Sequence, residues 1–266
     1  MVFSYYPGCT LKTTAKDLDL AARAVAEKLG VELREIPEWQ CCGGCYPSAK
    51  DEIAQRLSAV RALMDAAEKG TGLVTVCSAC HNVVKRTLFD LKNDPDFRKT
   101  CENYLGADLK KASDVKVYHF AELLRDVIGF DAVRAAVENP LTGKKIGAYY
   151  GCLLLRPGKV MGFDDPENPS VLEDLIRLTG AEAAYFAARN ECCGGYLSLE
   201  DPGIPARRSA EILMSAKASG ADALVTACPL CLYNLKKNGN GSLPVLYLTE
   251  LLAEAMGLKK EKDGTK

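Results

Sequence analysis

The sequence lacks the features that would direct it to a membrane, a secretory route or a nucleic acid. Lysine and arginine number 34 against 35 aspartate and glutamate, so the formal net charge of −1 gives no electrostatic argument for binding nucleic acid or an anionic membrane. The N-terminus has no basic stretch followed by an apolar run, and no uninterrupted apolar segment reaches the length that spans a bilayer. These absences predict a cytoplasmic protein. Its 266 residues, 48% hydrophobic and 26% charged, suffice for a globular core and for two ordinary domains.

Two signatures of redox cofactor sites are also missing. No G-x-G-x-x-G fingerprint follows the first predicted strand, and no other flavin or nicotinamide site is evident. The C-x2-C-x2-C-x3-C-P run of ferredoxin modules does not occur either. We therefore expect no flavin or nicotinamide to be bound by this chain.

Cysteine is the residue type that the chain has in excess, with 12 copies. Structural disulfides are rare in a reducing cytoplasm, so a set of this size indicates metal or redox chemistry. Free cysteines packed as small apolar residues would explain one or two of them. Vicinal pairs followed by two glycines occur twice, as Q-C-C-G-G-C-Y at residues 40–46 and E-C-C-G-G-Y at residues 191–196. Adjacent cysteines are poor disulfide partners, because the short ring forces unfavourable geometry.

Ten of the 12 cysteines form two sets of five, because the chain is internally repeated. Four cysteines recur at an offset of 151 residues and the first recurs at 143; the pairs are Cys9 with Cys152, Cys41 with Cys192, Cys42 with Cys193, Cys77 with Cys228, and Cys80 with Cys231. Cys45 and Cys101 have no counterpart. Duplication of a unit of roughly 120–140 residues is the simplest account. We expect domains at residues 1–143 and 144–258, a polar tail at 259–266, and an insertion in the first copy at 94–114.

The fold expected from the hydrophobic pattern is α/β, with two pseudo-symmetric repeats. Strands are predicted at residues 2–6, 31–36, 73–76 and from 117 in the first half, and at 145–150, 181–186, 224–226 and from 245 in the second. Helices alternate with them, including 49–68 and 205–218, so each half forms a small, mostly parallel sheet flanked by helices.

All five repeated cysteines of each half follow the carboxyl end of a strand and precede a helix. They should therefore gather at the edge of the sheet where ligands bind in open α/β folds. Helix N-termini at that edge would stabilise an anionic centre. The glycine pairs suit close backbone approach and positive φ angles, although a plain tight turn would also explain them.

Five thiols per site favour an iron–sulfur centre over zinc. The spacing is C-x31-C-C-x34-C-x2-C in the first half and C-x39-C-C-x34-C-x2-C in the second. A lone C-x-x-C would be shared with zinc and thioredoxin-like sites. Zinc takes four ligands in closed structural sites, whereas iron–sulfur centres use thiolates and hold several irons. A structural zinc protein nevertheless stays among the alternatives.

This double arrangement resembles the cysteine-rich CCG domain, and the chain as a whole resembles the B subunit of heterodisulfide reductase. The resemblance leaves aside only residues 94–114 and 259–266. It implies one non-cubane 4Fe–4S cluster per domain, held by the five motif cysteines. The implied ligands are Cys9, Cys41, Cys42, Cys77 and Cys80 for the first cluster, and Cys152, Cys192, Cys193, Cys228 and Cys231 for the second. Cys45 and Cys101 are expected not to be ligands.

The resemblance also implies an enzyme, a disulfide oxidoreductase of anaerobic metabolism that works within a multisubunit complex. A disulfide would be reduced to two thiols between the two clusters, with electrons delivered through two partner subunits, one flavin-containing and one ferredoxin-like. The alternative is a non-catalytic electron-relay subunit of a larger dehydrogenase or oxidoreductase complex.

Four residues near the cysteines or in the strands are further candidates. His81 directly follows Cys80. We expect it to be a surface histidine at a helix N-terminus; the alternative is that it hydrogen-bonds a cluster sulfide or transfers a proton. Lys12 and Arg156 follow the first cysteine of each copy by three and four residues. They would either bind an anionic group of the substrate or stay solvated or in contact with sulfide. His119, in a predicted strand, is expected to pack in the core.

Overall fold

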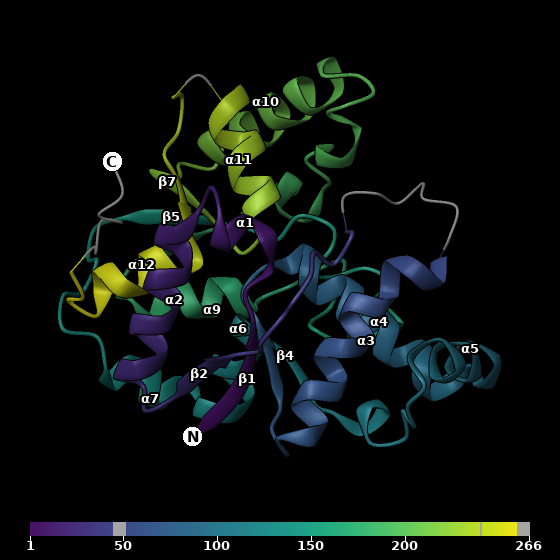
Figure 1. Cartoon of the computed structure of the whole chain (residues 1–266). Helices are drawn as coiled ribbons and strands as arrows, with labels where there is room; N and C mark the ends of the chain where they lie inside the picture. The colour runs from purple at the N-terminus through teal and green to yellow at the C-terminus, as the bar shows by residue number, and fades with distance from the viewer. Residues whose placement is uncertain (45–51, 240, 260–266) are drawn as a thin grey trace.

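The computed structural model describes residues 1–44, 52–239 and 241–259, and its main feature is two four-stranded sheets (Figure 1). The strand orders are β2-β1-β3-β4 and β6-β5-β7-β8, so both sheets have the same topology. The strands are β1 Val2–Tyr6, β2 Glu32–Glu35, β3 Leu73–Thr75, β4 Val117–His119, β5 Lys145–Tyr149, β6 Glu182–Ala184, β7 Ala223–Thr226 and β8 Val245–Tyr247. Neighbouring strands pair in parallel throughout. The predicted α/β fold with two repeats is confirmed.

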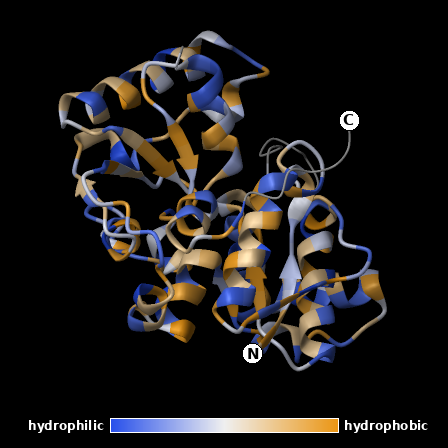
Figure 2. Ribbon diagram, turned by 90° about the vertical axis from the view of Figure 1, so that its left-hand side faces the viewer, coloured by the Kyte–Doolittle hydropathy of each residue, from blue (hydrophilic) through white to orange (hydrophobic). Residues whose placement is uncertain are grey.

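Helices connect the strands and cover both faces of each sheet. The first half contains α1 Gly8–Lys12, α2 Lys16–Lys28, α3 Glu52–Glu68, α4 Ser78–Asn93, α5 Pro95–Leu105, α6 Phe120–Glu122 and α7 Phe130–Ala135, with a 3₁₀ turn at Ala112–Asp114 and a π-helical turn at Leu123–Ile128. The second contains α8 Gly158–Met161, α9 Val171–Leu178, α10 Gly203–Ala218, α11 Pro229–Asn238 and α12 Leu248–Ala255, with 3₁₀ turns at Ala187–Asn190 and Gly195–Leu197. Parallel sheets covered in this way bury both faces, and apolar residues accordingly gather on the strands and the inward helix faces (Figure 2).

The expected insertion at residues 94–114 contains α5, which packs on α3 and α4. Asp94 starts this helix by accepting hydrogen bonds from the amides of Asp96 and Phe97, and Gly106, in the left-handed region at φ 64°, ends it. Cys101 lies on its inner face and is fully buried. The insertion is therefore polar in composition but has a packing face of its own.

The two halves are joined by contacts between helices that are far apart in sequence. The C-terminal helix α12 crosses and contacts α2 of the first half (Figure 1), and Thr249 Oγ1 donates to the Leu18 carbonyl at 3.2 Å. Helix α4 contacts α8, and α6 contacts α9. The cysteine-bearing edges of the two sheets thus belong to one packed unit.

Some expectations fall outside the described residues. Cys45 and the start of the helix predicted at 49–68 lie in the segment 45–51, and most of the predicted tail lies at 260–266. Within the residues that the structure does describe, none of the helices combines the length and apolar character needed to cross a bilayer.

Candidate metal site

The repeated cysteines lie at the carboxyl edge of each sheet, as the sequence predicts. Cys9 lies in α1, directly after β1, and Cys152 occupies the equivalent turn after β5. Cys77 and Cys228 are the residues that precede α4 and α11, and Cys80 and Cys231 lie in the first turns of these helices. The vicinal cysteines lie in the loops that follow β2 and β6. Three separate segments per half thus bring their thiols to one place.

The thiols pair in the same way in both halves. The sulfur–sulfur distances are 3.6 Å for Cys9 and Cys41, 3.5 Å for Cys42 and Cys80, 3.5 Å for Cys152 and Cys192, and 3.5 Å for Cys193 and Cys231. All five thiols of the second set line one cavity. Two thiolates on one tetrahedral metal, each about 2.3 Å from it, lie about 3.8 Å apart, so each pair has a spacing suited to sharing a metal ion.

The described residues contain no group of three or more histidine, cysteine, aspartate or glutamate side chains placed to hold a single metal ion. A closed zinc site needs four donors around one point. Five thiols per half exceed those four donors, whereas a centre with several metal positions can use all five.

The two thiol sets meet through Cys77 and Cys228. The hydrogen bond between these thiols raises the pKa of Cys77, while hydrogen bonds from Cys231 and then from Cys77 lower the pKa of Cys228. Both side chains are buried. The C-x-x-C segments of the two halves meet here, because the amide and the hydroxyl of Ser78 both donate to the Ala227 carbonyl, at 3.2 and 2.7 Å.

Several thiols are held in an environment that favours the thiolate, which is the form that binds metals. Hydrogen bonds from the thiols of Cys41 and Cys80 lower the pKa of Cys42 to about 4. A hydrogen bond from Cys152, assisted by the Gly194 amide, lowers the pKa of Cys192 to about 6. The vicinal pair of each half therefore supplies a thiolate near neutral pH.

Glycines let the backbone approach the sulfur atoms closely. A Cβ on Gly8 would lie 2.6 Å from Cys80 Sγ, and one on Gly151 would lie 3.1 Å from Cys231 Sγ; both glycines have positive φ, 74° and 65°. In the C-C-G-G loops, Gly43 and Gly194 have φ of 72° and 74°. The expected positive φ is found at the first glycine of each C-C-G-G pair and not at Gly44 or Gly195. Gly8 and Gly151 were missed, although the repeated Y-Y-P-G-C and Y-Y-G-C segments contain them.

Buried hydroxyl and imidazole groups fix the backbone around the C-x-x-C segments. The Tyr247 hydroxyl oxygen lies 2.6 Å from the Val76 carbonyl oxygen and 2.9 Å from that of Ala227, so the two carbonyls share its one proton; these residues precede Cys77 and Cys228. His119, at the matching strand position in the first half, has Nε2 3.0 Å from the Val76 carbonyl. Its Nδ1 accepts from the Ala121 amide, which leaves the proton on Nε2. The prediction that His119 packs in the core is confirmed.

His81 corrects an expectation, since it is fully buried and not at the surface. Its Nδ1 lies 3.1 Å from Thr75 Oγ1, and its Nε2 lies 3.1 Å from Glu122 Oε2. Burial opposes the ionisation of Glu122, but His81 and Lys85 outweigh it and lower the pKa of this carboxyl to about 2. The first turn of α4 packs in the interior beside β4, so His81 faces Glu122 instead of solvent. The ring nitrogens of His81 thus contact Thr75 and Glu122, and neither of these contacts is a cysteine.

Lys12 and Arg156 are neutralised by carboxylates of their own half. Lys12 Nζ lies 2.9 Å from Glu35 Oε2. Arg156 contacts Glu167 at 3.0 Å and donates to the carbonyl of Asn190 at 2.8 Å. The structure therefore gives both residues an internal ion pair, which was not among the roles expected for them.

The fold and the thiols together define a class of protein: an internally duplicated α/β chain with five cysteines at the same edge of each sheet. The CCG family of cysteine-rich domains matches residues 3–85 and 146–236. The chain belongs to this family, as the spacing of its cysteines predicts.

Curated relatives cover almost the whole chain. A protein of Archaeoglobus profundus, named as similar to the B subunit of heterodisulfide reductase, is 30% identical over 98% of this chain and 92% of that protein. The 8-methylmenaquinol:fumarate reductase membrane anchor subunit of Wolinella succinogenes is 28% identical, over 98% of this chain and 94% of that protein. The fold is shared with a crystal structure of a hypothetical protein from Helicobacter pylori. The TM-score is 0.71 and the identity 14%, and the match covers 97% of this chain and 49% of that chain. The family match and the Archaeoglobus profundus relative support the predicted class of metal-binding iron–sulfur oxidoreductase subunits.

Proposed function

We propose that this chain is the iron–sulfur subunit of a heterodisulfide reductase-type complex and that it reduces a disulfide to two thiols. The observation that carries the proposal is the junction of the two C-x-x-C segments, where Ser78 Oγ donates to the Ala227 carbonyl at 2.7 Å and two equivalent thiol sets come together. The balanced reaction is RS–SR′ + 2 e⁻ + 2 H⁺ → RSH + R′SH. Its two electrons match two one-electron centres side by side.

The proposed cofactors are two non-cubane 4Fe–4S clusters. Residues 1–143 would hold one and residues 144–258 the other; the proposed ligands are Cys9, Cys41, Cys42, Cys77 and Cys80, and Cys152, Cys192, Cys193, Cys228 and Cys231. When bound, such clusters supply one-electron transfer. The donor set fits them, because the thiols pair at 3.5–3.6 Å and the pKa values of Cys42, Cys192 and Cys193 are lowered. Gly8 and Gly151 keep the backbone clear of the sulfur atoms.

Electrons must come from partner subunits under this proposal. One flavin-containing partner and one ferredoxin-like partner would deliver them, as in heterodisulfide reductase-type complexes. Membership in the same family as the Archaeoglobus profundus protein supports this assembly, because that protein is named after a heterodisulfide reductase.

A second candidate is an electron-relay subunit of a larger oxidoreductase complex. The relative from Wolinella succinogenes favours it, because that protein is named as a subunit of a fumarate reductase. In this case the thiol sets would hold the same clusters, but no disulfide would be reduced on them.

Two measurements on anaerobically purified protein test these proposals. Iron and acid-labile sulfide should be present at about eight irons per chain, while zinc without sulfide would overturn the cluster assignment. Disulfides are then offered with a reduced one-electron dye, and thiol release and the EPR spectrum of the oxidised protein are followed. Thiol release and a changed spectrum support the reductase. A full iron content, with a spectrum that no thiol or disulfide alters, would favour the relay.

A further inference from the structure

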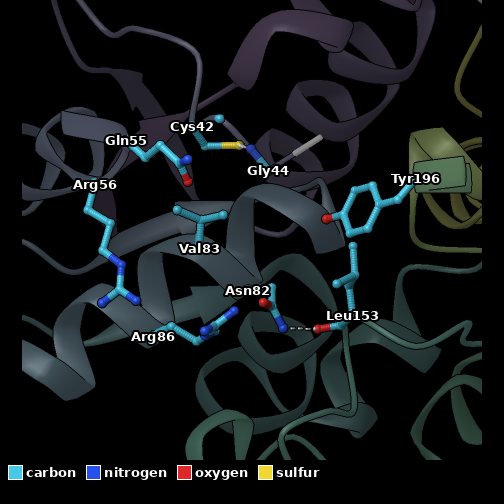
Figure 3. A pocket seen from close by; sticks show the side chains of 10 residues that line it. Cys42, Gly44, Gln55, Arg56, Asn82, Val83, Arg86, Leu153 and Tyr196 are labelled. Carbon is cyan, nitrogen blue, oxygen red and sulfur yellow. Dashed lines mark hydrogen bonds between the residues drawn. The ribbon is translucent and has the colours of Figure 1, made fainter. Parts of the chain in front are cut away.

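A polar cavity of about 160 Å³ lies between the two halves, beside Cys42 (Figure 3). Its lining includes Cys42, Arg56, Asn82 and Arg86 from the first half and Leu153 and Tyr196 from the second. The volume is close to that of a cavity of roughly 150 Å³ that accepts benzene. It would therefore admit a group of about six or seven non-hydrogen atoms next to a thiol of the first set.

The charge of this cavity is positive. Its described lining contains two arginines and no aspartate or glutamate. Arg56 is held by Asp90 and lies over the Phe97 ring, 5.1 Å from its centre. Arg86 is exposed, and no carboxylate within residues 1–44, 52–239 and 241–259 pairs with it. A guanidinium in this state offers planar, charge-assisted hydrogen bonds to an oxyanion.

The walls of the cavity are fixed by hydrogen bonds across the halves. The side-chain amide of Asn82 donates to the carbonyls of Leu153 (2.7 Å) and Arg156 (2.8 Å), and Figure 3 shows the first of these bonds below the cavity. Leu153 and Tyr196 also line the cavity of the second thiol set. A molecule held here would therefore extend from Arg86 toward both thiol sets.

We propose that this cavity is an oxyanion subsite that binds a carboxylate, sulfonate or phosphate group on a sulfur-containing small molecule. Arg86 determines the preference for the anion, while Arg56, whose charge Asp90 compensates, forms part of the wall beside it. The proposal rests on the proposed function, because it takes the sulfur of the ligand to be what the thiol sets act on. It also moves anion recognition away from Lys12 and Arg156, whose charges are already compensated.

The second half supplies a matched control. Lys237, 151 residues after Arg86, occupies the same repeat position on α11, where it is exposed and lies over the Tyr233 ring at 5.5 Å. Replacing Lys237 by glutamine removes one positive charge from the corresponding helix without touching the cavity. A general effect of net charge would therefore appear in both variants, and a subsite effect only at Arg86.

The experiment measures binding of non-reducible thioethers to the cluster-loaded protein by calorimetry. The probes are 3-(methylthio)propanoate, 2-(methylthio)ethanesulfonate and 2-(methylthio)ethyl phosphate, with neutral 3-(methylthio)propanol as reference. Arg86→Gln should weaken binding of the preferred anion about five- to tenfold, the size expected for losing a charge-assisted hydrogen bond at a partly exposed site. Binding of the alcohol should not change, Lys237→Gln should behave as wild type, and Arg86→Lys should recover part of the affinity. Raising the salt from about 50 to 500 mM should weaken the anions alone.

Equal affinities of Arg86→Gln and wild type for every anion would overturn the subsite, as would an equal loss in Lys237→Gln. Iron content and thermal unfolding verify that each variant is folded. The same variants separate this proposal from the function on which it rests. Anion binding that depends on Arg86 without reduction of any disulfide would refute the reductase and leave the subsite in place. Disulfide reduction with the same KM for anionic and neutral substrates, unaffected by Arg86→Gln, would refute the subsite and leave the reductase.

Discussion

Replacing Gly8 by alanine should remove one metal site and spare the other. Gly8 has φ 74°, where alanine costs about 1–2 kcal/mol relative to glycine. The new Cβ would lie 2.6 Å from Cys80 Sγ, so this sulfur must move by about 1 Å to regain an ordinary contact. Cys80 also forms the 3.5 Å pair with Cys42, and that pair would be lost. Gly30 isolates the backbone cost, because its φ is 73° and nothing lies within 4 Å of its Cβ position.

The assay combines metal analysis with unfolding. We expect Gly8→Ala to fall from about eight to about four irons per chain, and Gly30→Ala to keep about eight while losing a similar 1–2 kcal/mol of stability in urea. Gly151→Ala, with a milder contact of 3.1 Å to Cys231 Sγ, should affect the second site and leave the first. Full iron content in Gly8→Ala, or an equal loss of iron in Gly30→Ala, would refute the reasoning that close approach of the backbone holds the sulfur in place.

Three other predictions concern the ligands and the junction of the halves. Cys193→Ser should halve the iron content, because it removes the second cluster. Cys101→Ala alters a buried thiol outside both sets and should leave the iron content full. Loss of neither cluster in Cys193→Ser would contradict the ligand assignment. Tyr247→Phe should lower the free energy of unfolding by about 1–3 kcal/mol, because two buried carbonyls lose their hydroxyl donor, and an unchanged urea midpoint would contradict this. Burial lowers the pKa of His119 to about 3, so the unfolded chain takes up a proton first as pH falls below about 6.5. Between pH 6 and 5 this histidine should therefore lower the free energy of unfolding by about 1.4 kcal/mol per pH unit. An equal dependence of the free energy of unfolding on pH in His119→Gln would disprove this contribution.

The arrangement of strands could be predicted from the sequence because the duplication displays each element twice. The apolar segments 73–76 and 224–226 end at matching C-x-x-C motifs, so either copy supports the other. In the structure the first of these strands ends one residue earlier, at Leu73–Thr75, and the second begins one residue earlier, at Ala223–Thr226. Helix α5 was harder to anticipate, since its exposed face dominates the composition and its buried face has no counterpart in the second half.

The surroundings of the cysteines could not be predicted, because they depend on partners distant in sequence. His81 pairs with Glu122, which lies on another element, and nothing near position 81 indicates this carboxylate. Lys12 likewise finds Glu35 only when β1 and β2 pair. A position close to a repeated cysteine was therefore a poor guide to exposure or to charge, although the cysteine spacing alone was a good guide to which thiols lie together.

The two halves keep the same five cysteines but differ at the surfaces where they meet. His119 in the first half corresponds to Tyr247 in the second, and both reach the Val76 carbonyl. Arg86 corresponds to Lys237, which is directed at its own Tyr233 and not at the junction. The cavity beside the first set is therefore cationic, whereas leucine and tyrosine side chains complete the cavity of the second set. Two equivalent sets of thiols with unequal walls would receive an unsymmetrical molecule in one orientation, which a strictly symmetric pair of domains could not impose.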